Sequence, residues 1–199
     1  IYNPARGFNP QEHFLNINSA TKKRFGEENE NIIYLGLGNR TITGGDHMTI
    51  PTTEYHYEEW EKYVRYVMEF SGAKKFEIWN EPNLWAHKTQ PEQYVELVRR
   101  TVKVVKEYNP EFKVGIGCLA NPSDKNNAHV FFDDLIKNGI FEIDFDAITL
   151  HPYSIEPEYH IETVEYYRDL AEKNGRPDIE FWHTEYGYHN GFSANVTYK

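Results

Sequence analysis

Short apolar runs alternate with longer amphipathic stretches from residue 31 to residue 190. The run Ile32–Gly38 is almost continuously apolar, which is typical of a strand buried on both faces of a parallel sheet. In the stretch 57–70, apolar residues recur every three or four positions with charged residues between them, so an amphipathic helix is predicted. Gly72 is expected to end that helix, because glycine readily adopts the left-handed conformation found after helices.

Four later segments combine strand-forming residues with turn residues at their ends, and this pattern predicts strands at 75–80, 112–118, 146–150 and 179–184. Helical periodicity between them predicts helices at about 89–108, 127–138 and 158–174. Thr89-Gln90-Pro91-Glu92 is interpreted as a capping box that begins the first of these helices. Residues 39–52 are expected to form a loop, and residues 1–30 an irregular N-terminal segment.

Strand and helix alternate without an internal repeat or linker, so residues 1–199 are interpreted as one α/β domain with parallel strands. Two architectures fit this order: an open doubly wound sheet and a (β/α) barrel. Nucleotide-binding folds carry a glycine-rich phosphate loop after a strand. Gly36 and Gly38 lack both the third glycine and an immediate helix, which disfavours nucleotide-binding folds.

The composition narrows the class of partner. A formal net charge of −10 argues against nucleic acid as a ligand. The 15 Tyr, 12 Phe and 4 Trp suit a groove that stacks on polar, ring-shaped ligands, although an aromatic core accounts for most such residues. No apolar run approaches the roughly 20 residues of a membrane span. Cys118 is the only cysteine, so we expect a buried small apolar residue and neither a disulfide nor a thiolate metal cluster.

Groups that can carry out chemistry follow three of the predicted strands. Asn80 and Glu81 lie at the exit of the second strand, His151 and Tyr153 at that of the fourth, and Glu185 at that of the fifth. Because the ends of parallel strands lie at one edge of a sheet, these side chains are expected to converge. Two glutamates in an aromatic cleft are the minimum for cleaving a glycosidic bond. One is protonated to donate to the leaving oxygen, and the other is ionised to attack or to activate water.

Three motifs give a more specific resemblance. Trp79-Asn80-Glu81-Pro82-Asn83, His151-Pro152-Tyr153 and Thr184-Glu185-Tyr186-Gly187 occur in this order at successive strand ends. Together they resemble the clan A glycoside hydrolases, which are retaining (β/α)8 barrels, and most closely the family 39-like members. The resemblance covers roughly residues 31–190, and it implies a TIM-barrel-type fold of which this chain holds about five βα units, strands three to seven.

The resemblance also implies roles for individual residues. Glu81 corresponds to the acid/base and Glu185 to the nucleophile of a double-displacement reaction on an oligo- or polysaccharide. Asn80 would bind the sugar 2-hydroxyl, Tyr153 would donate to the nucleophile, and His151 would line the −1 subsite. Retention implies carboxyl groups about 5–5.5 Å apart, against roughly 6.5–9.5 Å for inversion. No metal or cofactor is expected, since this mechanism needs none.

Two tryptophans beside the acid/base position are candidates for binding the sugar ring. Trp79 precedes Asn80, and Trp85 lies in the next loop, where it could equally be a packing residue. His87 and His183 are interpreted as structural.

The barrel is expected to be incomplete. Strands one, two and eight of the family are not found, nor are the Arg and Trp that they supply, since the context of Arg6 does not match. Five parallel strands would leave two unpaired edges, which is a solubility problem. We therefore predict that the chain is part of a larger barrel or that another chain or segment completes it. The start at Ile1, without Met or a signal peptide, also indicates a processed product or a fragment.

Two other functions stay open. One is a carbohydrate-binding remnant of such a barrel that has lost catalysis. The other is a metal-dependent hydrolase using His183, Glu185 and His189, which is disfavoured because these residues do not lie on one helix face. The substrate class favours a secreted or extracellular location. The sugar, the linkage and endo or exo action are left undetermined.

Overall fold

Five strands form one parallel sheet, in which each strand pairs with the next one along the chain. The computed structural model describes residues 23, 31–36, 38–84, 89–153 and 158–187. Within them the strands are β1 (Ile32–Leu35), β2 (Lys75–Ile78), β3 (Lys113–Ala120), β4 (Ala147–His151) and β5 (Glu180–His183). A doubly wound sheet reverses its strand order at a switch point. The strictly sequential order here is that of a (β/α) barrel, so the predicted fold class is confirmed.

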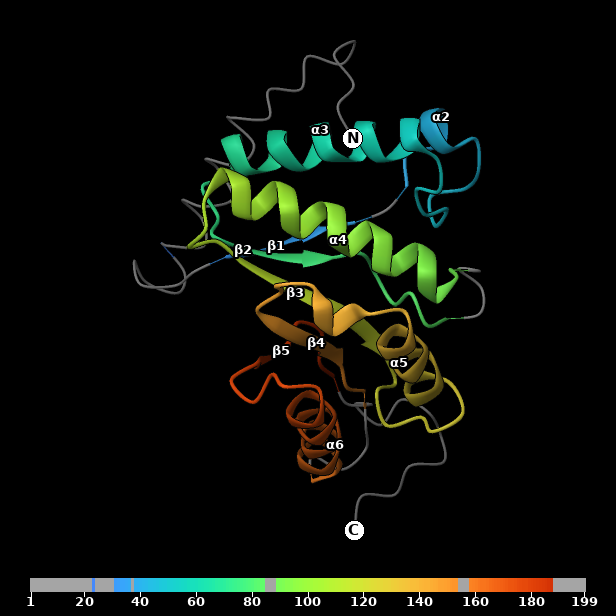
Figure 1. Ribbon diagram of the computed structural model, residues 1–199, viewed down its shortest axis with the longest axis vertical. Coiled ribbons are helices and arrows are strands. Elements are labelled where there is room, and N and C mark those ends of the chain that lie inside the picture. The colour runs from blue at the N-terminus through green and yellow to red at the C-terminus, as the bar shows by residue number, and fades with distance from the viewer. Residues whose placement is uncertain (1–22, 24–30, 37, 85–88, 154–157, 188–199) are drawn as a thin grey trace.

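Helices connect the strands in the predicted alternation. They are α2 (Arg40–Thr43), α3 (Glu54–Ser71), α4 (Pro91–Tyr108), α5 (Ala128–Lys137) and α6 (Tyr159–Lys173), with the 3-10 helix η3 (Ile140–Glu142) before β4. In Figure 1, α3 and α4 lie side by side over the β1–β3 part of the sheet, and α5 and α6 lie beside β4 and β5. None of the described helices combines the length and apolarity needed to cross a membrane.

Local signals explain where the helices begin and end. The hydroxyl of Thr53 accepts a hydrogen bond from the His56 amide at the start of α3, and Gly72 ends that helix with φ 67°, as predicted. The capping prediction for α4 was displaced by one residue: the N-cap is Gln90, whose amide donates to the Gln93 side chain at 3.3 Å. Thr89 cannot be the cap, because Pro91 takes the first helical position.

Residues 39–52 were predicted to be a loop, but they contain the short helix α2. The Asn39 side chain accepts a hydrogen bond from the Thr41 amide at 2.9 Å and caps this helix, and Gly44 ends it with φ 71°. A four-residue helix has too few turns to show an apolar period, so the capping residues were its only sequence signal.

The hydrophobic core lies between the sheet and the helices. Phe76 and Ile78 of β2 are fully buried there, and the inward face predicted for α4 is confirmed. A buried hydrogen bond of 2.8 Å, from Trp60 Nε1 of α3 to Thr101 Oγ1 of α4, joins the two helices within this layer. The α4 side chains that are buried include Tyr94, Val98, Val102 and Val105.

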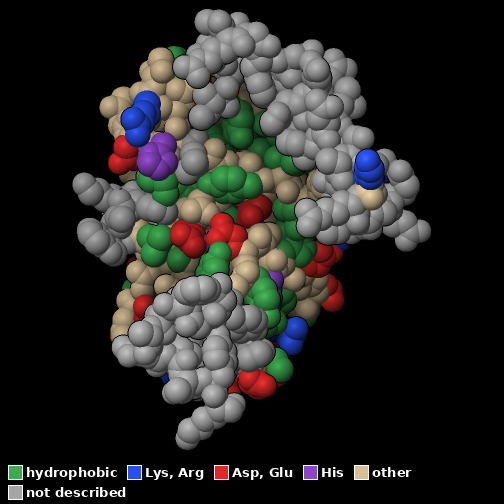
Figure 2. All heavy atoms as spheres, turned by 180° about the vertical axis from the view of Figure 1, so that it is seen from behind, with side chains coloured by type: hydrophobic (Ala, Val, Ile, Leu, Met, Phe, Trp, Pro, Cys, Tyr) green, Lys and Arg blue, Asp and Glu red, His purple; other side chains and the backbone are tan. Residues whose placement is uncertain are grey.

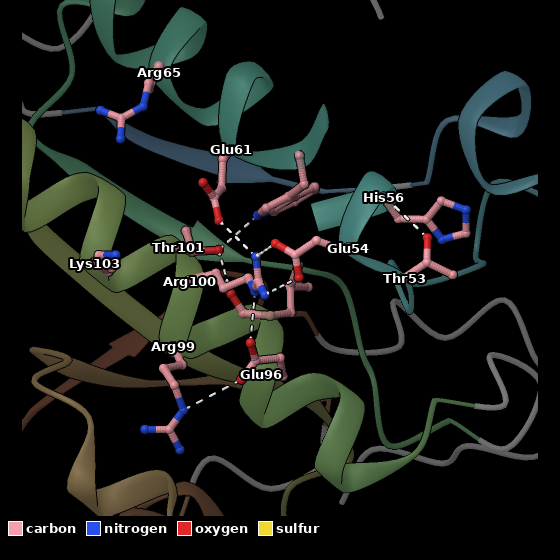
Figure 3. Close-up of polar contacts among 12 residues, drawn as sticks. Thr53, Glu54, His56, Glu61, Arg65, Glu96, Arg99, Arg100, Thr101 and Lys103 are labelled. Carbon is pink, nitrogen blue, oxygen red and sulfur yellow. Dashed lines mark hydrogen bonds and ion pairs between the residues drawn. The ribbon is translucent and has the colours of Figure 1, made fainter. Parts of the chain in front are cut away.

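An ionic cluster centred on Arg100 joins α3 to α4 at the surface (Figure 3). Its guanidinium donates to both carboxylate oxygens of Glu54, at 2.8 and 2.6 Å, and to Glu96 at 2.7 Å. Glu61 lies 3.4 Å from the same group. The guanidinium also stands 4.6 Å from the Tyr57 ring centroid, so the Arg100 side chain contributes both charge and packing to the helix pair.

The first strand is an edge strand. It was predicted to be buried on both faces, but Ile32 is 39% and Tyr34 37% exposed. The reason is that β1 pairs only with β2 among the described residues, just as β5 pairs only with β4. The described sheet therefore has two open edges, as the predicted incomplete barrel requires.

Candidate active site

Strand alternation directs a set of polar side chains away from the helices. In β2, Phe76 and Ile78 enter the core, so Glu77 between them points to the opposite face. Thr149 and His151 of β4 share that face, since Ile148 and Leu150 are core residues. Figure 2 views this side of the molecule and shows acidic side chains gathered near its middle, beside hydrophobic ones.

Space for these side chains comes from Gly115 on β3, which is in register with Glu77. A Cβ at Gly115 would lie 2.5 Å from Cγ2 of Thr149 and 2.8 Å from the Trp182 ring. Further along β3, a bulge between Ile116 and Leu119 turns the chain, and Cys118 there has φ 46°. Bulges of this kind redirect side chains next to functional sites.

The turn after β2 holds Glu81 in an unusual backbone conformation. Trp79 has φ 65° and Glu81 has φ 44°, both in the left-handed region that non-glycine residues rarely adopt. The Trp79 amide donates to the Leu35 carbonyl of β1 at 2.8 Å and fixes the start of the turn. Each such residue costs on the order of 1–3 kcal/mol, and strain of this kind is concentrated at functional sites.

Asn83 anchors the other end of this turn. Its side chain exchanges two hydrogen bonds with the Ala120 backbone at the end of β3, of 2.9 and 3.0 Å. The Asn83 amide also donates to the Asn127 side chain at 2.6 Å, and the Asn127 amide returns a bond to the Asn83 carbonyl at 3.0 Å. The loop that carries Glu81 is thus tied to the neighbouring strand.

His151, the last residue of β4, lies among three carboxylates. Its Nδ1 is 3.2 Å from Oε1 of Glu81 and 3.7 Å from Oε2 of Glu185. Its Nε2 is 3.8 Å from Oε1 of Glu77, an ion-pair distance longer than a hydrogen bond. Burial alone would disfavour the charged ring, but the three carboxylates outweigh it and raise the pKa of His151 to about 9. The imidazole is therefore a cation at neutral pH.

Tyr153 and Glu185 meet because β4 and β5 stay paired beyond their ends. An isolated parallel bridge joins Tyr153 to Gly187, and the Tyr153 hydroxyl donates to Oε2 of Glu185 at 2.9 Å. That bond to a carboxylate, together with burial, raises the pKa of Tyr153. The ring packs so closely on Gly187 that a Cβ there would lie 3.0 Å from Tyr153 Cε1.

The two predicted catalytic carboxylates lie close together. One side-chain atom each from Glu81, His151 and Glu185 lies within 4.8 Å of the other two, so a carboxylate oxygen of Glu81 approaches one of Glu185 to that distance. Two carboxylates thus lie close together at the ends of two parallel strands, as the sequence predicts. Asn80, beside Glu81, is half-buried.

Glu77 is a site residue that the sequence motifs did not reveal. It is 4% exposed and accepts a short hydrogen bond from the Thr184 hydroxyl. Burial would raise the pKa of Glu77, but the nearby His151 ring, the Thr184 hydroxyl and the polar groups of Cys118 and Thr149 outweigh burial and lower it. A charged residue between the apolar Phe76 and Ile78 was the available signal, since a buried strand rarely carries a glutamate.

Two sets of described side chains are close enough to hold a metal ion: Glu77, Cys118 and His151, and Glu81, His151 and Glu185. His151 belongs to both sets. Its ring and the Cys118 thiol, whose pKa burial raises strongly, would each have to lose a proton before binding an ion.

Some predicted site residues lie elsewhere. Trp79 is fully buried, because its left-handed backbone ends the alternation of β2 and its ring packs against Trp60, 5.8 Å between centroids. A ring without exposed surface cannot stack on a sugar, so Trp79 is a core residue and not a substrate platform. His183 is exposed and its ring lies 6.0 Å from His160, away from Glu185's partners. The residues predicted from the sequence that lie outside the described part are Arg6, Trp85, His87 and His189.

Comparison with known proteins supports the fold. No family model matches the chain. Among solved structures, a GH39 beta-xylosidase from Caulobacter crescentus is similar at 23% identity and a TM-score of 0.53, over 71% of this chain and 32% of that one. A glucosidase from Croceicoccus marinus is similar at 18% identity and a TM-score of 0.65, over 97% of this chain and 42% of that one.

A third similar structure is BuGH86 in complex with neoagarooctaose, at 17% identity and a TM-score of 0.61, over 95% of this chain and 38% of that one. The chain thus spans about a third to two fifths of the length of the structures it resembles. The likeness to glycoside hydrolase barrels predicted from the three motifs, and the prediction of a partial barrel, are confirmed at the level of the fold.

Proposed function

We propose that this protein is a retaining glycoside hydrolase acting on O-glycosidic bonds of an oligo- or polysaccharide. The observation that carries the proposal is the approach of Glu81 and Glu185 to within 4.8 Å between side-chain oxygens, at the ends of two strands of a barrel-type sheet. Such a pair is the equipment that a double displacement needs. The names of the similar structures, a xylosidase and a glucosidase among them, point to the same class of reaction.

The two carboxylates take different roles in this mechanism. In the first step, Glu185 attacks the anomeric carbon while Glu81 donates a proton to the departing glycosidic oxygen, leaving a glycosyl ester on Glu185. In the second step, Glu81 removes a proton from water as the water oxygen attacks the anomeric carbon, and the free Glu185 carboxylate is released. Two inversions leave the configuration at the anomeric carbon retained.

Neighbouring groups fit these roles. The Tyr153 hydroxyl donates to Glu185 and holds one oxygen of the nucleophile in a fixed direction. His151 borders both carboxylates and lines the proposed −1 subsite. Asn80, next to Glu81, is proposed to bind the sugar 2-hydroxyl. Trp85 remains a proposed sugar platform on sequence grounds alone.

Catalysis also requires a closed barrel, in our proposal. The unpaired edges of β1 and β5 need partner strands, supplied by further sequence or by another chain, to shield the cleft from water. Those strands would contribute the remaining subsite walls, so the identity of the sugar depends on them.

The test is turnover of a panel of aryl glycosides by the protein and by its Glu185→Gln and Glu81→Ala variants. We expect Glu185→Gln to lose activity by at least about 1,000-fold, since no nucleophile remains. The matched control is Glu180→Gln, at the first residue of β5, the strand that Glu185 follows. Oligosaccharide binding without any turnover would instead support the carbohydrate-binding remnant.

A small nucleophile separates the roles of the two glutamates. With an activated aryl glycoside the leaving group needs no acid, so Glu81→Ala should form the glycosyl ester and stall. Azide should then restore turnover and yield a glycosyl azide of retained configuration. Inverted glycosyl azide from Glu81→Ala together with retained azide from Glu185→Gln would show that the roles are reversed, and rescue of neither variant would contradict the assignment.

A further inference from the structure

We propose that Glu77 is a positioning residue, whose buried carboxylate anchors the cationic ring of His151 so that the ring holds Glu81 and Glu185 at their working separation. The inference rests on the proposed function. The dependence of His151 on Glu77 rests separately on the geometry of the sheet face that points away from the helices, here called the inner face. We do not expect Glu77 to contact the substrate, because the His151 ring lies between Glu77 and the pair Glu81 and Glu185.

Glu77 lies on the inner face of the sheet. Strand alternation and the register with Tyr34 and Gly115 place it on the inner face, and Gly115 supplies no side chain that would screen it from β4. The Thr184 hydroxyl donates to Oε1 of Glu77. The same oxygen lies 3.8 Å from Nε2 of His151, so a neutral donor and the imidazole both approach Oε1.

The His151 ring has carboxylates at both of its nitrogen atoms. Glu77 faces Nε2, while Glu81 and Glu185 share Nδ1, so the ring separates one buried carboxylate from the two proposed catalytic ones. Among the described residues, other titratable groups near this face are Cys118 of β3, Tyr34 of β1 and Tyr153, which donates to Glu185. Of the three carboxylates Glu77 is the most buried, and so the one least screened by solvent.

The charge on His151 affects the separation of Glu81 and Glu185. Glu81 and Glu185 carry like charges at short range and repel each other when both are ionised. A cation on His151 offsets that repulsion and fixes both side chains through one nitrogen. Without the negative charge of Glu77 behind it, the buried ring would lose its proton more easily, and the pair would separate.

The experiment compares Glu77→Gln with the wild-type protein and with Glu180→Gln, a carboxylate at the start of β5 that pairs with Lys113. Histidine labelled with ¹³C and ¹⁵N is titrated by NMR, and the His151 signal is assigned by its loss in His151→Phe. We expect the pKa of His151 to fall by about one to three units in Glu77→Gln and to stay unchanged in Glu180→Gln. Glu77→Asp, which keeps the charge, should restore most of the shift.

Kinetics then separate positioning from simple folding. We expect Glu77→Gln to lower kcat by about 10- to 100-fold with KM changed by less than about twofold, because misplaced groups lose transition-state contacts. An unchanged pKa of His151 in Glu77→Gln overturns the inference whatever the activity. If Glu77→Gln does not fold, Thr184→Val, which removes the hydroxyl that orients Oε1 of Glu77, should give a smaller shift in the same direction, and no shift there also overturns the inference.

The failure of the proposed function has a different signature. A wild-type protein without turnover on any glycoside, whose His151 pKa nevertheless falls in Glu77→Gln, would retain the Glu77–His151 pairing and refute only the glycosidase assignment. Normal turnover, with a His151 pKa that does not change in Glu77→Gln, would support the glycosidase assignment and refute the positioning role of Glu77.

Discussion

His151 and Glu81 are 70 residues apart in the chain, yet Nδ1 of the histidine lies 3.2 Å from Oε1 of the glutamate. The contact joins the end of β4 to the turn after β2, across the intervening strand β3. Such a contact arises from parallel strands whose ends reach the same edge of the sheet. The pair also couples the charge of His151 to the stability of the fold.

The stability of the protein should decrease as the pH rises from about 6.5 to about 9 because of His151. Its pKa is raised from 6.5 to about 9 in the folded state, so the folded state binds a proton that the unfolded state has released over this range. The contribution is complete below pH 6.5 and is lost above pH 9. A shift of this size corresponds to roughly 3 kcal/mol.

Urea unfolding at pH 6.5 and at pH 9 measures this effect. Because other groups titrate too, the quantity of interest is the extra pH dependence of the wild-type protein over His151→Phe. Equal pH dependence of the two proteins would show that His151 is not cationic in the fold.

Asn83→Ala should destabilise the protein and reduce activity together. It removes the two hydrogen bonds to the Ala120 backbone and the bond to Asn127, each worth about 1 kcal/mol, so we expect a loss of about 2–3 kcal/mol. The freed loop carries Glu81, so kcat should fall as well. Asn174→Ala, which removes an exposed amide bonded to Leu170, is the control and should change the free energy of unfolding by less than about 0.5 kcal/mol.

Gly187→Ala should weaken the hydrogen bond from Tyr153 to Glu185. The added methyl group would lie 3.0 Å from the Tyr153 ring and displace it. A bond to a charged group is worth about 1.5–3 kcal/mol, so kcat should fall by roughly tenfold or more. In a double-mutant cycle with Tyr153→Phe, the second substitution should add little to the first, whereas additive effects would place the cause elsewhere.

Arg100→Met should cost about 1–2 kcal/mol of stability, because it breaks the contacts with Glu54, Glu61 and Glu96 that join α3 to α4 (Figure 3). Methionine keeps much of the apolar stem that packs near Tyr57, so the loss reports mainly on charge. Arg99→Met is the matched control. Arg99 is half-exposed and lies 3.6 Å from Glu96 alone, so its loss should be less than about 0.5 kcal/mol. Similar losses for both would show that the cluster does not join the helices.

High salt provides a second check on the Arg100 cluster. Glu54 is largely exposed, so part of the cluster should be screened, and the difference between Arg100→Met and the wild-type protein should shrink in about 1 M salt. A difference that is independent of salt would assign the effect to packing instead.

Much of the site could be predicted because its residues occupy strand ends. The apolar runs that form β2, β4 and β5 are short and bounded by turn residues, so the sequence marks where each strand stops. In a parallel sheet, the residues just after each strand lie at a common edge, whatever the details of packing. Glu81, His151 and Glu185 could be brought together on that ground alone.

Other features depend on the face of the sheet to which a side chain points. A shift of one residue along a strand reverses that direction. His183 and Thr184 are neighbours, but the histidine ring lies near His160 of α6 and the threonine hydroxyl reaches Glu77 on the inner face. Trp79 was expected beside the sugar and instead enters the core, because the backbone turns left-handed at that residue. Neither composition nor motifs predict these side-chain directions.

The sequence by itself therefore determined the order of the elements, the parallel fold and the strand ends at which the proposed catalytic groups stand, because periodicity and turn chemistry are local. Only the tertiary structure decided that Glu77 lies behind His151, that Trp79 is buried and that β1 is an open edge. These features depend on which residues of other strands face each side chain. That information arises only when segments distant in the chain pack together.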